Sequence, residues 1–279
     1  MKAFWLVASL AGCATGVFGQ PSSSASGSNP STCNATQILS VENFASGTAA
    51  NSLGSIASIS WCDFEFPAPT TPVTSVLVHG QPAFITLQNV MQTTPVTSVI
   101  FHGYPSYVSQ QIVAQLPNYG VSVNPAQLQL LRGNQTVAST SIQLSEFAPG
   151  IFTLNASPAG PAVVMDPRMN YILPANPARP GEAVTVFCEG LGPTNPFVPT
   201  GTVPQGLAVT VTTPQVFVGG QLAPVISSRL SRVDAIPSAA GVYEVTFVVP
   251  SVTTGTLNQP LYLQIGGKTS NTALLPVVP

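Results

Sequence analysis

The chain has 279 residues, of which only seven are Lys or Arg and nine are Asp or Glu, and its net charge is −2. So few basic residues, scattered along the chain, form no stripe that neutralises phosphates, which argues against nucleic-acid binding. The chain is nonetheless 44% apolar, unlike disordered segments, which combine low hydropathy with high net charge. Its 28 prolines and 23 glycines stand between short Val, Ile, Leu and Thr runs, a composition that favours all-β structure.

The N-terminus predicts an export signal followed by a linker. Residues 1–19 carry one Lys and an apolar run that is too short and too interrupted to span a membrane. Cleavage before Gln20 would release the protein, whereas the motif LAGC resembles a bacterial lipobox, in which Cys13 would be lipidated. We favour release over a lipid anchor, because the apolar run continues past Cys13 to Phe18. Residues 20–35, rich in Ser, Gly and Pro, form the linker.

A tandem repeat of 23 residues fills positions 70–92 and 93–115, and both histidines of the chain occupy the same position in it. The copies TTPVTSVLVHGQPAFITLQNVMQ and TTPVTSVIFHGYPSYVSQQIVAQ agree at 13 of 23 positions. Each copy predicts a hairpin in which His79 or His102 is the first residue of a tight turn. The related segment VFVGGQLAPVI has Gly219 in that place, so we expect positive φ at both histidines.

The internal similarity continues downstream and predicts two domains of one plan. QQIVAQLP (110–117) parallels YEVTFVVP (243–250), and the hairpin in 128–144 parallels the hairpin in 261–277. We therefore expect an all-β chain with two tandem immunoglobulin-like antiparallel β-sandwich domains after the signal peptide and linker. The expected domains are residues 36–147 and residues 148–279.

Three cysteines follow the signal region. A disulfide between Cys33 and Cys62 would clamp the start of the folded region and is worth ~3 kcal/mol in the chain-entropy model. Cys188, inside AVTVFCE, is expected to be a buried strand residue without a partner. Because the cysteines lack CxxC spacing and the acids lack Asp-x-Asp spacing, we expect no metal site and no cofactor.

Catalytic chemistry has little support in these residues, and we expect that the protein is not an enzyme. Without a Gly-x-Ser-x-Gly elbow, a secreted hydrolase that uses His79 or His102 is the least favoured hypothesis. Glu182 and Glu189 flank a predicted strand at an odd spacing, which places them on opposite faces and not in a catalytic pair. We expect Glu182 to cap the turn after Gly181 and Glu189 to lie at a strand end.

Five separated motifs in the second half resemble one family of exported proteins. In chain order they are APGIFTL, NPARPGEAVTVFCEGLGPTNP, PQVFVGGQLAPVI, GVYEVTFVVPS and IGGKTSNT. Their order and their residues resemble the repeated C-terminal domain of secreted acidobacterial proteins, the Solibacter-type uncharacterised C-terminal domain family. The segment ILSVENFASGTAANSLGSIASI (38–59) is similar to the module that usually precedes it. The resemblance implies an exported tandem β-sandwich protein and supplies neither an activity nor a ligand.

The chain departs from the family pattern at three places. WCDF stands at 61–64, where the family usually has a Gly-x-Asn-Leu turn, and the hairpin unit is duplicated where the family has one. The family pattern does not require His79 or His102. These departures leave the added hairpin as the feature particular to this chain.

A binding function is therefore favoured. Aromatic residues gather near Cys62 and near the second repeat copy, and aromatic surfaces on sheets hold sugars or protein partners. We expect Trp61 and Phe66 to pack in the core, whereas Tyr104, Tyr107, His79 and His102 are candidate contacts for a ligand or partner; Tyr119 lies in the second cluster.

The favoured function is thus that of a non-catalytic extracellular or cell-surface interaction and adhesion module, with a carbohydrate-binding module as the alternative. The partner would be a protein or a glycan at the cell surface, recognised by exposed aromatics or by pairing with a sheet edge that the extra hairpin lengthens. Contact with a membrane is expected only if Cys13 is lipidated.

Overall fold

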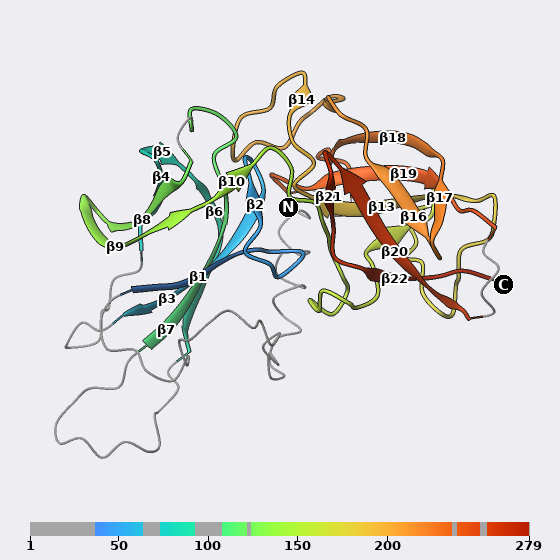
Figure 1. Cartoon of the computed structure of the whole chain (residues 1–279), viewed down its shortest axis with the longest axis horizontal. Coiled ribbons are helices and arrows are strands. Elements are labelled where there is room, and N and C mark those ends of the chain that lie inside the picture. The colour runs from blue at the N-terminus through green and yellow to red at the C-terminus, as the bar shows by residue number, and fades with distance from the viewer. Residues whose placement is uncertain are drawn as a thin grey trace, which may run out of the picture.

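The computed structural model describes residues 37–63, 73–92, 108–121, 124–235, 239–251 and 256–278. Within these ranges the regular elements are β-strands, and they include no helix with the length and hydropathy to cross a membrane. The strands form two groups that lie side by side, as Figure 1 shows. Strands of residues 37–145 pair with one another, and so do strands of residues 150–276. We call residues 37–147 the N-terminal sandwich and residues 148–278 the C-terminal sandwich.

The N-terminal sandwich consists of two antiparallel sheets, in the orders β1-β3-β7-β6 and β5-β4-β8-β9. Their strands are β1 (Gln37–Asn43), β3 (Ile56–Asp63), β4 (Ser75–Val78), β5 (Gln81–Pro82), β6 (Phe84–Gln92), β7 (Val108–Gln115), β8 (Ala126–Arg132) and β9 (Gln135–Ile142). A short parallel pair joins β2 (Asn51–Ser52) to β10 (Leu144–Ser145).

The C-terminal sandwich follows the same plan. One sheet runs β11-β13-β19-β18-β15-β14, with β12 also paired to β13, and the other runs β17-β16-β20-β21, with β22 also paired to β20. Their strands are β11 (Gly150–Ile151), β12 (Val164–Met165), β13 (Ala183–Glu189), β14 (Thr194–Asn195), β15 (Val209–Thr210), β16 (Gln215–Val218), β17 (Gln221–Ala223), β18 (Val225–Leu230), β19 (Tyr243–Val248), β20 (Asn258–Ile265), β21 (Lys268–Thr269) and β22 (Ala273–Pro276).

Both sandwiches have the strand order of immunoglobulin domains. Taken in chain order as strands A, B, C, C′, D, E, F and G, the strands β1 and β3 to β9 form the sheets A-B-E-D and C′-C-F-G. In the C-terminal sandwich β11, β13, β16, β17, β18, β19, β20 and β22 form the same two sheets. This topology confirms the predicted immunoglobulin-like fold. It also confirms the internal alignment, because β4, β7 and β8 correspond to β16, β19 and β20.

Alternating apolar residues fill each sandwich. Along β8, Ala126, Leu128 and Leu130 are buried, and they pack with the fully buried Trp61 of the facing sheet. Cys188 of β13 packs into the core of the C-terminal sandwich and forms no disulfide, as predicted. Such alternation lets one face of each strand contribute apolar surface to a common core.

The turn of the first hairpin also agrees with the sequence. His79 has a φ of 48° and Gly80 a φ of 78°, and at the corresponding turn Gly219 and Gly220 have φ of 58° and 78°. His79 is exposed there, between β4 and β5. The prediction of a turn histidine in the place of a glycine is therefore confirmed for this copy.

The two repeat copies meet in one sheet. The first copy, residues 70–92, supplies β4, β5 and β6, and the second copy, residues 93–115, supplies β7. β6 and β7, which are the last strands of the two copies, pair antiparallel. The predicted hairpin around His102 lies outside the described residues, so it stays a prediction.

Candidate functional site

The described residues include few of the candidates from the sequence. His79 lies on an exposed turn, and Cys62 lies on β3 with its backbone opposite Gln37 and Ser109. The other candidates fall outside the described ranges, and they are Cys13, Cys33, Tyr104, Tyr107 and His102. The Cys33–Cys62 disulfide and the ligand contacts of these side chains thus stay predictions. The strongest site in the described part of the chain lies elsewhere, at the seam between the two sandwiches.

An apolar cluster separate from the two sandwich cores joins the sandwiches. Its buried members are Ala45, Ile56 and Val113 from the N-terminal sandwich and Phe152, Val163, Met165, Phe187 and Val242 from the C-terminal sandwich. Phe187 and Glu189 lie two residues apart on β13, so they share the outward face of that strand, while Val186 and Cys188 face the inner core. The N-terminal sandwich covers this outward face, which leaves Glu189 with no exposed surface.

Glu189 connects the two sandwiches through its carboxyl group. Oε1 accepts a hydrogen bond from the backbone N–H of Ala45 at 2.7 Å, and Oε2 accepts one from the N–H of Ile56 at 2.5 Å. The backbone N–H of Phe44 also favours the charged form of this carboxyl. Buried polar groups are costly unless they are paired, and here each side of the seam satisfies the other. The sequence placed Glu189 correctly at a strand end but did not show that it is buried.

Burial nevertheless raises the pKa of the Glu189 carboxyl from 4.5 to about 8, because desolvation outweighs the backbone hydrogen bonds. A raised carboxyl pKa means that the folded chain binds more protons than the unfolded chain between pH 4.5 and about 8. The contribution of Glu189 to the free energy of unfolding should therefore be fully present below about pH 4.5 and should be lost as the pH rises to about 8. Urea unfolding from pH 5 to pH 8.5 measures this slope.

The variant Glu189→Gln is the control for this slope, because it has no carboxyl to titrate. The pKa of Glu42 is also raised by burial, so a smaller slope should persist at the acid end. Burial also raises the pKa of the Cys188 thiol and the Tyr243 phenol above their ordinary values. An unfolded thiol begins to ionise at about pH 8, so Cys188 adds to the slope only at the alkaline end, equally in the protein and in the variant. Stability that rises with pH, or a slope unchanged in the variant, would contradict the raised pKa of Glu189.

A second set of polar contacts links loop 118–120 to the segment that follows β14. Asn118 Nδ2 donates to the carbonyl oxygen of Val198 at 2.5 Å, and Thr200 Oγ1 donates to Asn118 Oδ1 at 2.9 Å. Gln115 Oε1 accepts a hydrogen bond from the N–H of Gly201 at 2.6 Å. Side chains of one sandwich thereby satisfy backbone groups of the other, and the seam is held at both its core and its rim.

Exposed aromatic rings lie beside these contacts. Tyr119 and Phe197 meet edge to face, with ring centroids 5.9 Å apart and an interplanar angle of 84°. They are 50% and 54% exposed, and Phe84, which is 46% exposed, packs its ring against Gly201. We call Phe84, Tyr119 and Phe197 the seam patch. Both sandwiches contribute to it, so it exists only when they are docked.

The chemistry of the seam patch is that of an apolar anchor with a neutral polar rim. Large exposed aromatics beside amide and hydroxyl groups are typical of the centre of a protein interface, where rings bury area and the rim supplies hydrogen bonds. The sequence pointed to Tyr119 as part of an aromatic cluster but missed Phe84 and Phe197. No signal in the sequence brings these residues together, because they lie on different sandwiches.

Two other carboxylates, Glu182 and Asp166, have local structural roles. Glu182 Oε2 accepts a hydrogen bond from the N–H of Arg179 at 3.0 Å, which confirms the predicted turn cap. Asp166 Oδ1 accepts from the N–H groups of Arg168 and Asn170, and the hydrogen bond from the Asn170 side chain is the main reason that its pKa is lowered. The described residues contain no group of three or more His, Cys, Asp or Glu arranged to hold a metal ion.

No family model and no curated protein matches the chain. Among solved structures it is similar to tandem Ig repeats of Dlar, at 12% identity over 88% of this chain and 99% of that one, with a TM-score of 0.20. A titin substructure is 14% identical over 86% of this chain and 96% of that one, with a TM-score of 0.22. The C-terminal domain of the Streptococcus pyogenes protein AspA is 9% identical over 88% of this chain and 99% of that one, with a TM-score of 0.19. The immunoglobulin-like fold rests on the strand order.

Proposed function

We propose that the protein is an exported, non-catalytic interaction module that binds a protein partner at the cell surface through the seam patch. The observation that carries this proposal is the exposure of three aromatic rings, Phe84, Tyr119 and Phe197, at a docked seam between two sandwiches. Scattered exposed apolar residues are ordinary, whereas a group of rings with a polar rim is what hot spots of protein interfaces contain.

The ring geometry favours a protein over a glycan at this patch. Sugars stack on the open faces of aromatic rings, and two rings serve one sugar chain best when their faces are roughly parallel. Tyr119 and Phe197 lie at 84° to each other, so they form a corner that accepts an apolar side chain. We therefore place the adhesion function at this seam.

Export remains part of this proposal because of the N-terminal sequence. Residues 1–19 have the composition of a secretory signal, and the resemblance to secreted acidobacterial proteins points to the same compartment. Mass spectrometry of the mature N-terminus tests it. A start at Gln20 would support release, a diacylated Cys13 would support a lipid anchor at the envelope, and an unprocessed Met1 would overturn export.

Removal of a ring of the seam patch should weaken partner binding. A photoreactive benzoylphenylalanine at Tyr119 would cross-link the bound protein on native cells, and the same group at Ile226, which is 59% exposed on β18, provides the control. Against the partner so identified, Phe197→Ala should weaken binding by about 30-fold, the size of a hot-spot loss. Ile226→Ala should have no effect.

The same experiment has clear contrary outcomes. Cross-linking at Ile226 equal to that at Tyr119, or unchanged affinity in Phe197→Ala, would overturn the seam patch as the binding site. Since the patch is uncharged, its affinity should also change little between low and high salt, in contrast to a charge-steered interface. A steep loss of affinity with salt would assign binding to another surface.

A further inference from the structure

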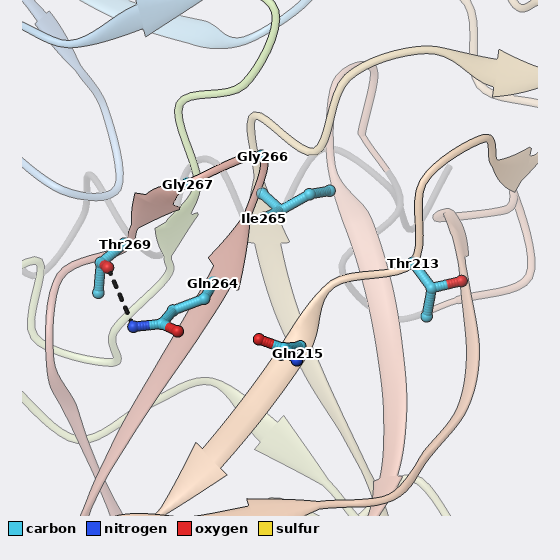
Figure 2. Close-up of a pocket in the computed structure, with 7 residues that line it drawn as sticks. All are labelled: Thr213, Gln215, Gln264, Ile265, Gly266, Gly267 and Thr269. Atoms are coloured by element: carbon cyan, nitrogen blue, oxygen red, sulfur yellow. Dashed lines mark hydrogen bonds between the residues drawn. The ribbon is translucent and has the colours of Figure 1, made fainter.

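A hollow of about 370 Å³ opens on the sheet β17-β16-β20-β21 of the C-terminal sandwich. Two amide side chains, two threonines, one isoleucine and the β20–β21 turn line it, and these residues are Gln215, Gln264, Thr213, Thr269, Ile265, Gly266 and Gly267. Figure 2 shows the amides of Gln215 and Gln264 on neighbouring strands, with Thr269 beside Gln264. The lining side chains carry no charge.

Strand register places an aromatic pair next to these amides. Gln215 lies opposite Gln264 in the β16–β20 ladder, and two residues along the same strands Phe217 lies opposite Tyr262. Because strand residues two apart share a face, both pairs belong to one surface. The rings of Phe217 and Tyr262 are stacked, with centroids 4.9 Å apart and an interplanar angle of 8°. Both residues are half-buried, so this surface combines apolar rings with neutral hydrogen-bonding groups.

The turn that closes the hollow is held in place. A Cβ on Gly266 would lie 2.2 Å from Cδ2 of Phe147, so the ring of Phe147 packs directly on this glycine. Gly267, with a φ of 73°, has open space where a Cβ would be. The Gln264 amide is oriented by a hydrogen bond from Nε2 to Thr269 Oγ1 at 3.3 Å. The hollow is therefore bounded by a packed turn and an oriented amide.

The N-terminal sandwich shows that the fold does not require this arrangement. At the corresponding positions of the β4–β8 ladder, Ser75 lies opposite Leu131 and Leu77 lies opposite Gln129. Neither the paired glutamines nor the paired rings occur there, although the strands and the register are the same. The amides and rings of the C-terminal sheet are thus additions to the fold, available for recognition.

We propose that this hollow is a binding subsite for a neutral carbohydrate. Amides and hydroxyls both donate and accept hydrogen bonds, which suits the hydroxyl groups of a sugar. The rings of Phe217 and Tyr262 cover each other's inner faces, so what they add beside the amides is the apolar surface that the stacked pair leaves exposed. An uncharged lining offers nothing to a phosphate or sulfate. The subsite is separate from the seam patch and adds a glycan contact to a protein that binds a partner elsewhere.

Nuclear magnetic resonance of the full mature chain tests the subsite directly. The probes are neutral hexasaccharides of glucose, mannose and xylose in α- and β-linked forms, added at millimolar concentration. At least one should shift the side-chain amide signals of Gln215 and Gln264 in a saturable manner. A hexasaccharide of glucuronic acid should shift them less, because the subsite holds no cation to neutralise it.

Matched variants separate binding from folding. Gln215→Ala and Gln264→Ala change partly or fully exposed side chains, and each should weaken binding of the active hexasaccharide by about tenfold. Ser75→Ala and Gln129→Ala, on the corresponding sheet of the N-terminal sandwich, should leave binding unchanged. No amide shift with any neutral probe, or equal losses in both pairs of variants, would overturn the proposal. Neither result affects the cross-linking readout at Tyr119, so the two proposals fail independently.

Discussion

Replacing Glu189 with alanine should lower the free energy of unfolding by about 3–5 kcal/mol, because the backbone N–H groups of Ala45 and Ile56 lose their acceptor inside the seam. Glu189→Gln should be milder, since one amide oxygen still accepts while the NH₂ group faces a donor. For a chain of this size the alanine variant should melt roughly 10 °C lower. Calorimetry and urea unfolding of the purified protein measure both changes.

Glu182→Ala is the matched control. Glu182 lies at the other end of β13 and caps one N–H group in a partly exposed turn, so its loss should cost no more than about 1 kcal/mol. A loss at Glu189 no larger than at Glu182 would mean that solvent satisfies the orphaned N–H groups and that the seam is open. Glu189→Ala should also weaken partner binding, since the seam patch requires docked sandwiches.

Replacing Gly190 with alanine should cost about 3–5 kcal/mol, because the methyl group would meet backbone and not a movable side chain. Its Cβ would lie 1.9 Å from the carbonyl oxygen of Ala148, while the N–H of Ala148 donates to the oxygen of Gly190 at 3.0 Å. Either the chain between the sandwiches shifts or this hydrogen bond breaks. Urea unfolding gives the energy, and the fluorescence of Trp61 reports whether the N-terminal sandwich is affected.

Gly181→Ala isolates the steric part of this effect. Gly181 has a φ of 84° and Gly190 a φ of 72°, so both disfavour a side chain, but a Cβ on Gly181 meets nothing within 4 Å. Its substitution should cost about 1–2 kcal/mol from backbone strain alone. Equal losses in the two variants would show that Ala148 yields easily and that the close approach contributes little.

Both predictions concern the same structural property, the fixed placement of one sandwich against the other. Glu189 satisfies donors from across the seam, and Gly190 lets the connecting segment approach β13. The aromatic corner of Tyr119 and Phe197 depends on that placement, because one ring comes from each sandwich. Variants that loosen the seam should therefore lose partner binding before they lose secondary structure.

The sequence by itself determined the local architecture. Alternating apolar residues, turn glycines and strand-ending prolines specify hairpins, and these signals act over a few residues. The similarity of the two halves then carried the strand order from one sandwich to the other. The positive φ at His79 and the buried Cys188 followed from the same reasoning.

Only the tertiary structure decided which distant segments form a common surface. In the sequence Glu189 is an ordinary strand-end carboxylate, and the structure shows that the N-terminal sandwich covers its side of β13. Phe84, Tyr119 and Phe197 are isolated aromatics in the sequence, and docking of the sandwiches brings Tyr119 against Phe197 and Phe84 against Gly201. Sequence periodicity specifies which face of a strand points inward, but packing between domains determines which outward residues meet, and that packing leaves no local pattern in the chain.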